Sequence, residues 1–523
     1  MTISAKLRLG TLAAPLALLS ALALLPACSP PAAEKAAEKA GVAEIAWRDG
    51  DVADAFQEAA EQGKPVLLYW GAVWCPPCNR LKAGLFKDPD FVARTRDFIP
   101  VYLDGDSAGA QAWGERFKIK GYPTLIILRP DRTEVTRLSG SGDPGQVTAT
   151  LAAVQKGSAN VAELLKRAQS DPKALSADDW TVIAGFGGWQ DEEAEGGAAA
   201  TLAKLAAVAP TEPLKRQFAL QALAQRPKDA PALTPAAQAE ARKTLEAVLA
   251  SPEELRGNRS TLTYGAVRLV QAAAPAGPER EALAKALVTG LDGFHADESL
   301  GTGDRLSSLG AEIALYRASH PNGASKDIAL PPELVEKVHQ RVAWADGAAK
   351  NPYERQSLIS TAARLLGDAG DKPGAERLLK AELEKSQAPY YYMPSLAKLA
   401  EERGDTGAAV DWLKRGYETS EGPASRVQWG VTYVEGLLRL TPDDKAGIET
   451  AAAQVLGELA GQPDSYHQRT RQRLEGLGKS LNAWSASHDG AQTLEKLRLR
   501  TAEVCTGQAG DALAACRSWL GSA

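Results

Sequence analysis

The sequence predicts an α/β domain in which strands alternate with helices, followed by a long all-α region built from helical hairpins. Two observations predict this architecture. Short apolar runs alternate with amphipathic segments between residues 51 and 154. From residue 157 onward, alanine- and leucine-rich helical periodicity replaces this pattern without a convincing strand. The 523 residues also exceed the roughly 100–200 residues of a single domain.

Composition narrows the classes of function. Hydrophobic residues make up 44% and charged residues 24% of the chain, a balance typical of globular proteins that excludes a wholly disordered chain. The net charge is −5, and no long cluster of lysine or arginine occurs. A protein that binds nucleic acid needs such clusters to neutralise phosphates, so nucleic acid is not an expected partner.

The N-terminus predicts export and a lipid anchor. Residues 1–27 have the layout of a signal peptide, because Lys6 and Arg8 precede an apolar stretch over residues 9–25. The ending Leu25-Pro26-Ala27-Cys28 resembles the lipobox of bacterial lipoproteins, in which the cysteine is acylated. That resemblance, with Ser29 next, implies a lipid-anchored protein of the outer membrane. The alternative is an ordinary signal peptide cut near Ala27, with Cys28 a spare thiol.

Residues 28–43 are predicted to be the lipidated cysteine and a tether, since they contain Pro30-Pro31 and few bulky apolar groups. The first helix is predicted from Asp51, a suitable N-cap, to a stop at Gly63. Residues 65–70 form a continuous apolar run that is too short for a helix. This run therefore predicts a strand buried on both faces.

The remaining elements of the α/β domain follow from the same patterns. A helix is predicted to open at the Cys75 to Cys78 motif and to run through Leu85. The next predicted strands and helices are strands at 98–103, 124–128 and 134–138, and helices at 108–117 and 147–154. The domain is expected to cover residues 44–156, and the helical domain residues 157–523.

The helical region contains one internal repeat. A shift of 34 residues takes Gly370-Asp371 to Gly404-Asp405 and Ala363 to Ala397. This period resembles the tetratricopeptide repeat and predicts similar helix pairs. The alternative is a chance coincidence in an alanine-rich chain. Clear helical periodicity also marks the segments 214–225, 235–249, 279–291, 332–342 and 446–459.

The five cysteines divide into three groups. If Cys28 carries lipid, two pairs remain, Cys75 with Cys78 and Cys505 with Cys516, and export would let both persist as disulfides.

At the start of a helix, Cys75 is expected to have a lowered pKa and to react as a thiolate. Cys78, one turn deeper, can then form a disulfide with it and release a bound partner. Pro76 and Pro77 suit the first helical turn and stiffen it.

These motifs resemble the thioredoxin superfamily over residues 44–156. The resemblance lies in the apolar strand, Trp74-Cys75-Pro76-Pro77-Cys78, and Gly121-Tyr122-Pro123-Thr124 ahead of a strand. It implies a central mixed sheet flanked by helices, with Trp74, Pro76, Pro77 and a cis Pro123 supporting the two cysteines. Within the superfamily, this stretch is similar to the C-terminal domain of membrane thiol:disulfide interchange proteins.

One position departs from the superfamily pattern. Six residues before its first active-site cysteine, thioredoxin has a buried aspartate that handles a proton, whereas this chain has Tyr69. A buried carboxylate is the natural proton relay, so fast turnover is in doubt. Asp104 is the candidate substitute.

The cysteine pairs allow two other interpretations. A zinc site needs four ligands, and the histidines lie near neither pair, so no metal or other cofactor is expected. A purely structural disulfide at Cys75 and Cys78 is the second alternative. For Cys505 and Cys516 the structural interpretation is favoured, because they lie in a helical tail with Gly507 and Gly510 between them.

Aromatic residues outside the motif are predicted to be core. Tyr390-Tyr391-Tyr392 could line a binding groove, but packing is favoured. The same interpretation covers the scattered tryptophans, namely Trp180, Trp189, Trp344, Trp429 and Trp484.

The resemblance implies an envelope thiol:disulfide oxidoreductase of the periplasm that acts as a reductase through Cys75 and Cys78. Its expected partners are disulfide-containing client proteins, a membrane thiol electron donor and the membrane that holds its lipid anchor. The helical region would select clients or dock the protein in an assembly. The alternative is a helical protein-binding scaffold whose α/β domain has little turnover, which the tyrosine at position 69 supports.

Overall fold

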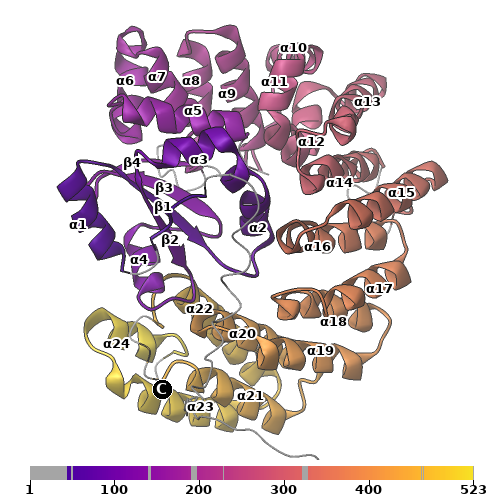
Figure 1. Ribbon diagram of the computed structural model, residues 1–523. Coiled ribbons are helices and arrows are strands. Elements are labelled where there is room, and N and C mark those ends of the chain that lie inside the picture. Colours follow the sequence, from indigo (N-terminus) through magenta and orange to yellow (C-terminus); the bar gives the residue numbers. More distant parts are fainter. Residues whose placement is uncertain are drawn as a thin grey trace, which may run out of the picture. The chain divides into compact units, whose positions relative to one another are not determined.

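A four-stranded mixed sheet forms the centre of the α/β domain in the computed structural model (Figure 1). The structure describes residues 44–521 apart from 49–50, 139–142, 190–196, 228, 321–324, 326–327, 461 and 463–464. Residues Ala43–Ala523 form one compact unit. The predicted signal peptide, Cys28 and the whole of the tether lie outside the described residues.

The sheet has the strand order β2-β1-β3-β4. Its strands are β1 (Val66–Gly71), β2 (Ile99–Asp104), β3 (Thr124–Leu128) and β4 (Glu134–Leu138). β1 pairs with β2 in parallel, whereas the β1–β3 and β3–β4 pairs are antiparallel. The expected mixed sheet flanked by helices is therefore confirmed, and all four predicted strands lie within a residue or two of their expected positions.

Side chains alternate between two buried faces along β1, because successive strand residues point to opposite sides of a sheet. Val66, Leu68 and Trp70 pack against helices α1 (Val52–Gln62) and α4 (Ala110–Arg116). Leu67 and Tyr69 pack on the other face, in a cluster that includes Cys75 and Cys78. All six residues of β1 are buried, as expected for a central strand.

The helices of this domain are α1 (Val52–Gln62), α2 (Pro76–Ala83), α3 (Pro89–Thr95), α4 (Ala110–Arg116) and α5 (Pro144–Gln155), with a 3-10 turn η1 (Leu85–Lys87). The sequence predicted one helix through Leu85, but α2 ends at Ala83 and α3 was missed. Asp88, whose side chain accepts from the backbone N–H of Phe91, begins this second helix, and Pro89 occupies its first position. A helix of seven residues is too short to show a clear period.

The helical region runs from α6 to the C-terminus. Its helices are α6 (Val161–Ser170), α7 (Ala177–Ala184), α8 (Gly197–Val208), α9 (Glu212–Ala224), α10 (Pro235–Ala250), α11 (Pro252–Gly257), α12 (Arg259–Ala273), α13 (Pro278–Gly293), α14 (Thr302–Ala318), α15 (Pro332–Ala348), α16 (Pro352–Asp368), α17 (Lys372–Glu382), α18 (Met393–Glu402), α19 (Thr406–Thr419), α20 (Pro423–Leu440), α21 (Lys445–Gly457), α22 (Gln468–Ser487), α23 (Ala491–Val504) and α24 (Gly510–Ser518). The 3-10 turns are η2 (Pro172–Ala174), η4 (Phe294–Ala296), η5 (Pro389–Tyr391) and η6 (Cys505–Gly507).

The 34-residue repeat corresponds to two helix pairs with the same turn. Gly370 and Gly404 connect α16 to α17 and α18 to α19, and both adopt positive φ, at 86° and 80°. Glycine reaches this conformation without a steric cost. Asp371 and Asp405 then cap α17 and α19 through their side chains. The match of turn and cap shows that the repeated residues serve the same structural purpose in both pairs.

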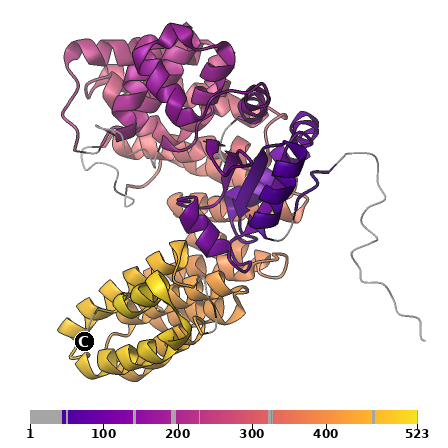
Figure 2. The same cartoon turned by 90° about the vertical axis from the view of Figure 1, so that its left-hand side faces the viewer.

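Helices distant in sequence pack against the α/β domain. α7 lies against α5, α16 against α2, and α22 against α4. In Figures 1 and 2, the α/β domain lies between the first and the last helices of the helical region. Within the described residues, every helix is too short or too polar to cross a membrane.

Candidate redox site

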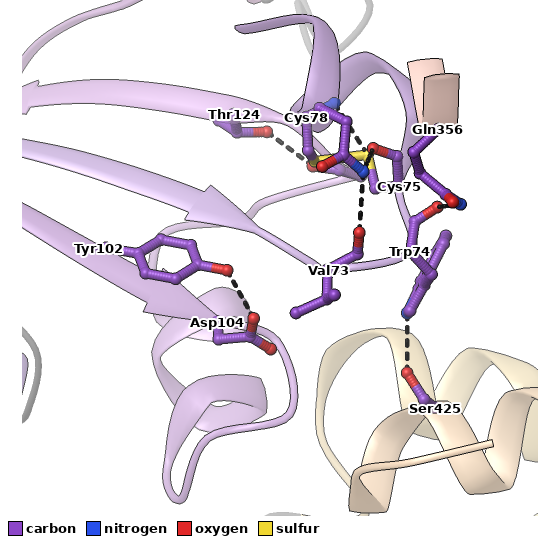
Figure 3. The surroundings of a disulfide bond; sticks show 11 residues. Val73, Trp74, Cys75, Cys78, Tyr102, Asp104, Thr124, Gln356 and Ser425 are labelled. Atoms are coloured by element: carbon purple, nitrogen blue, oxygen red, sulfur yellow. Dashed lines mark hydrogen bonds between the residues drawn. A yellow bond between two sulfur atoms is a disulfide. The ribbon is translucent and has the colours of Figure 1, made fainter. Parts of the chain in front are cut away.

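The two cysteines of the predicted motif lie where β1 leads into α2. They form a disulfide with their Cα atoms 5.2 Å apart, drawn in Figure 3. Cys75 is the N-cap of α2, with an extended backbone, and Pro76 and Pro77 fill the first helical positions. Proline fits there because the first N–H groups of a helix have no intrahelical acceptor.

Hydrogen bonds hold the loop before the helix. Asn79, which is buried, donates from Nδ2 to the carbonyl oxygens of Val73 at 2.8 Å and Cys75 at 3.0 Å. The Cys78 N–H points at Cys75 Sγ, 3.2 Å away. In the reduced protein, that N–H and the helix dipole would favour a Cys75 thiolate over the thiol.

The loop before β3 completes this side of the site. The Tyr122–Pro123 peptide bond is cis. The Tyr122 ring stacks on Trp70 and meets the edge of Trp74, with both pairs of ring centroids 5.5 Å apart. Thr124 donates from Oγ1 to the Gly121 carbonyl at 2.8 Å, which closes the turn. The loop that carries Trp74 thereby packs against the loop before β3.

Tyr69 is buried under the motif without a hydrogen-bond partner for its hydroxyl. Burial raises the pKa of Tyr69, and the nearby charge of Asp104 raises it further. Its ring stacks on that of Tyr102 at 5.1 Å. The side chain is neutral at physiological pH, so a carboxylate is missing where the superfamily pattern places one.

Asp104, the candidate substitute, ends β2 and accepts a hydrogen bond of 2.5 Å from the Tyr102 hydroxyl. Its other carboxylate oxygen accepts from the backbone N–H of Asp106 at 2.9 Å. In Figure 3, Tyr102 and Asp104 are drawn apart from the disulfide, Tyr102 to the left of Val73 and Asp104 below it. Burial lowers the pKa of Lys82, whose Nζ lies 5.2 Å from the centre of the Tyr102 ring. A proton-relay role for Asp104 stays a prediction.

The helical region supplies side chains that sequence reasoning missed. Gln356 on α16 and Ser425 on α20 hydrogen bond to Trp74 (Figure 3). Trp429 and Tyr391 pack against the Trp74 ring. These residues lie some 280–350 positions from the motif in sequence, and no local pattern marks them.

Most of the aromatic residues outside the motif are packed in the core, as the sequence predicts. Tyr390 and Tyr392 are buried, as are Trp180, Trp189, Trp429 and Trp484. Trp344 is partly buried. Tyr391 and Trp429 combine packing with contact to Trp74, which the prediction of a plain core did not include.

The second cysteine pair has a different setting. Cys505 and Cys516 form a disulfide with Cα atoms 5.8 Å apart, between the end of α23 and the interior of α24. Cys505 begins the 3-10 turn η6, and both cysteines are fully buried. The described residues contain no group of three or more His, Cys, Asp or Glu side chains that could hold a metal ion.

Comparison with known proteins gives matches over the α/β domain. A family model described as thioredoxin-like matches residues 46–130. The thiol:disulfide interchange protein DsbD 2 of Pseudomonas aeruginosa is 32% identical over 91 residues, which cover 17% of this chain and 16% of that protein. DsbD 1 of the same organism is 30% identical over 91 residues, which cover 17% of this chain and 15% of that protein. The chain thus spans about a sixth of the length of these relatives.

Among solved structures, a thioredoxin from Thermus thermophilus is 24% identical with a TM-score of 0.20, and the match covers 21% of this chain and 88% of that one.

Proposed function

We propose that the protein is an envelope protein-disulfide reductase, because its residues 46–130 form a domain of the thioredoxin superfamily. This domain carries the Cys75–Cys78 disulfide. The observation that carries the proposal is the disulfide at the N-terminus of α2, directly after Trp74, whose ring meets that of Tyr122 at the cis Tyr122–Pro123 bond. A thiol-disulfide oxidoreductase needs a nucleophilic and a resolving cysteine within bonding distance, and this site has both.

The reaction proceeds through two exchanges. The Cys75 thiolate attacks one sulfur of a substrate disulfide, forms a mixed disulfide and releases the other substrate sulfur as a thiolate. Cys78 then loses its proton and attacks Cys75 Sγ, which forms the Cys75–Cys78 disulfide and releases the second substrate thiol. The substrate gains two electrons and two protons, and a dithiol donor must reduce the enzyme again.

The proposal that the protein reduces its substrates, rather than oxidising them, rests on the residues between the two cysteines. The residues between the cysteines are Pro76 and Pro77, so the site lacks the histidine that strong oxidants of the superfamily carry there. The names of the relatives, thiol:disulfide interchange proteins, support exchange chemistry in either direction. The proposed clients are disulfide-containing proteins, and the proposed donor is a membrane thiol protein.

The location is proposed from the N-terminal sequence. Residues 1–27 have the pattern of a lipoprotein signal. We place the mature protein in the periplasm, held in the outer membrane by lipid on Cys28. Globomycin-sensitive processing and membrane association that is lost in Cys28→Ala are the expected results. A wild-type protein that fractionates as soluble would contradict them.

A second candidate function is a helical protein-binding scaffold with a redox domain of low turnover. Two observations favour it. Cys75 is 2% exposed in the folded protein, and Tyr69 supplies no carboxylate for proton transfer.

Insulin reduction separates the two functions. The purified full-length chain and its Cys75→Ser variant are compared with dithiothreitol as the electron source. The reductase predicts a rate well above that of Cys75→Ser. Equal rates would contradict the reductase and leave the scaffold as the remaining candidate.

A further inference from the structure

The helical region covers the side of the motif from which a substrate would approach. Trp74 is 8% exposed and Cys75 2% exposed, whereas Val73 immediately before them is 43% exposed. Thiol–disulfide exchange requires an incoming sulfur to reach the attacking sulfur, so its rate depends on access. A disulfide carried on a polypeptide cannot reach Cys75 while this cover is in place.

Three helices and a turn contribute to the cover. Gln356 on α16 donates from Nε2 to the Trp74 carbonyl at 3.2 Å. Tyr391 at η5 stacks on the Trp74 ring with centroids 5.9 Å apart, and Trp429 on α20 meets the ring edge-on at 5.0 Å. The Arg469 guanidinium on α22 lies 5.7 Å from the centre of the same ring.

A chain of hydrogen bonds fastens α20 to the α/β domain. Trp74 donates from Nε1 to Ser425 Oγ at 2.7 Å, and Ser425 donates from its hydroxyl to Asp106 at 2.6 Å and from its backbone N–H to Asp106 at 2.7 Å. The N-cap of α20 is Gly422, which has no side chain to cap the helix. Asp106 therefore acts as the cap from the α/β domain, because its side-chain oxygens accept from the Ser425 N–H and hydroxyl.

The close fit at this point depends on Gly422. Its φ is +88°, and a Cβ atom there would overlap the side chain of Asp106. Any larger residue would push α20 away from Asp106 and would also adopt a strained backbone.

A second carboxylate of the α/β domain caps a second helix. Glu115 on α4 accepts from the backbone N–H of Gln468, the first residue of α22, at 2.9 Å. The same carboxylate contacts His467 Nδ1 at 3.0 Å and accepts from Arg471 at 2.8 Å. Two helices of the cover thus begin on acidic side chains of the α/β domain.

We propose that this cover is the specificity element of the reductase: it must open before a protein disulfide reaches Cys75, and the Asp106–Ser425–Trp74 chain and Gln356 set how readily it opens. A low-molecular-weight disulfide needs a smaller opening than a polypeptide does. The substrate claim rests on the proposed reductase function, whereas the access claim concerns the fold alone. Asp106, Ser425 and Gln356 act through Trp74 and the cover, so they are positioning residues.

The experiment measures access to Cys75 in the reduced full-length chain. Iodoacetamide is the small probe, and a maleimide on a long polyethylene glycol chain is the large one. Mass spectrometry and gel shift report the alkylation rate at Cys75. The first variant is Asp106→Ala, which removes the cap of α20. The second is Ser425→Ala, which removes the hydroxyl but keeps the backbone N–H bond to Asp106, and it tests the proposal if Asp106→Ala fails to fold. Asp444→Ala is the matched control, because Asp444 caps α21 through Gly447 N–H in the same way.

The ratio of large-probe to small-probe rates is expected to rise about tenfold in Asp106→Ala and several-fold in Ser425→Ala, since a hydrogen bond to a charged group shifts an equilibrium by about this factor. Asp444→Ala should leave the ratio unchanged. Reduction of insulin, relative to reduction of oxidised glutathione, should rise in parallel in the two cover variants.

An unchanged ratio in both cover variants, or an equal rise in Asp444→Ala, would overturn the proposal. A raised access ratio without insulin reduction by any variant would uphold the cover and refute the reductase. Insulin reduction with an access ratio that is insensitive to both substitutions would support the reductase and refute the cover.

Discussion

The two disulfides of this protein differ in their surroundings rather than in their burial. Cys78, Cys505 and Cys516 are all 0% exposed, and Cys75 is 2% exposed. Cys75, however, caps the N-terminus of α2 and lies three residues from its partner. Cys505 lies just after the end of α23, eleven residues from its partner. A helix N-terminus favours a thiolate, whereas a helix C-terminus disfavours negative charge.

This comparison shows that burial alone does not identify a structural disulfide. Cys75 and Cys78 belong to the core cluster that includes Leu67 and Tyr69 of β1, and the helical region packs on Trp74 beside Cys75 through contacts that include polar ones such as Gln356 to Trp74. The Cys505–Cys516 pair is enclosed by its own helical tail. A reactive disulfide under a separable cover and an inert one in a core have similar exposed fractions.

The largest expected effect comes from replacing the cysteines of the motif. Cys75→Ser should abolish insulin reduction, because the nucleophile is lost. Cys78→Ser should accumulate a mixed disulfide between Cys75 and the substrate, since the resolving thiol is missing. Non-reducing gels with mass spectrometry detect this species. A Cys78→Ser variant that turns over at the wild-type rate would refute the assigned roles.

Removing the other disulfide should change stability and leave chemistry intact. Cys505→Ser combined with Cys516→Ser is expected to keep the wild-type rate of insulin reduction. The loop-closure model gives a loss of up to about 3 kcal/mol in the free energy of unfolding for a loop of this length. Thermal unfolding measures the loss in free energy of unfolding, and an insulin assay tests whether the rate of reduction is unchanged. A large fall in rate at unchanged stability would mean that this pair takes part in the redox chemistry.

The pH dependence of the cover gives an intermediate effect. Burial raises the pKa of Asp106 from 3.8 to about 6, against the lowering effect of the Ser425 hydrogen bonds and with a further rise from Asp104. Because the covered state binds the proton more tightly than the open state, the cover is strongest at low pH. It loses this stabilisation as the pH rises through about 6.

The ratio of large-probe to small-probe alkylation at Cys75 should therefore rise several-fold between about pH 5 and pH 7.5. Ionisation of Cys75 affects both probes equally and cancels in the ratio. The tyrosines that interact with Asp106 do not titrate in this interval, because burial raises the pKa of each of them, namely Tyr102, Tyr122 and Tyr390. A ratio that falls with pH, or that rises equally in Asp106→Ala, would contradict this assignment.

The smallest effect is expected in the repeat. Asp405→Ala removes the cap of α19, where Ala408 N–H donates to the carboxylate at 3.0 Å. A lost N-cap costs about 1 kcal/mol of stability. Chemical denaturation measures this cost, and insulin reduction should not change. A fall in activity as large as that of Cys75→Ser would mean that the repeat supports the redox site directly.

Local sequence signals predicted the strands, the Cys75 helix start and the 34-residue repeat that relates Gly370 to Gly404. These features depend on periodicity, capping and positive φ, which neighbouring residues determine. The contacts of Gln356 and Ser425 with Trp74 had no such signal, because they arise from packing between segments some 280–350 residues apart. The sequence therefore identified the cysteine pair but not the contacts of the helical region with Trp74.

The reduction potential of each cysteine pair tests the central claim most directly. The full-length chain is equilibrated in glutathione or dithiothreitol buffers, and mass spectrometry of alkylated peptides follows both pairs in one sample. We predict a potential near about −270 mV for Cys75–Cys78 and below about −300 mV for Cys505–Cys516. A Cys75–Cys78 potential near about −120 mV would make the protein an oxidant, and joint titration below about −300 mV would make both disulfides structural.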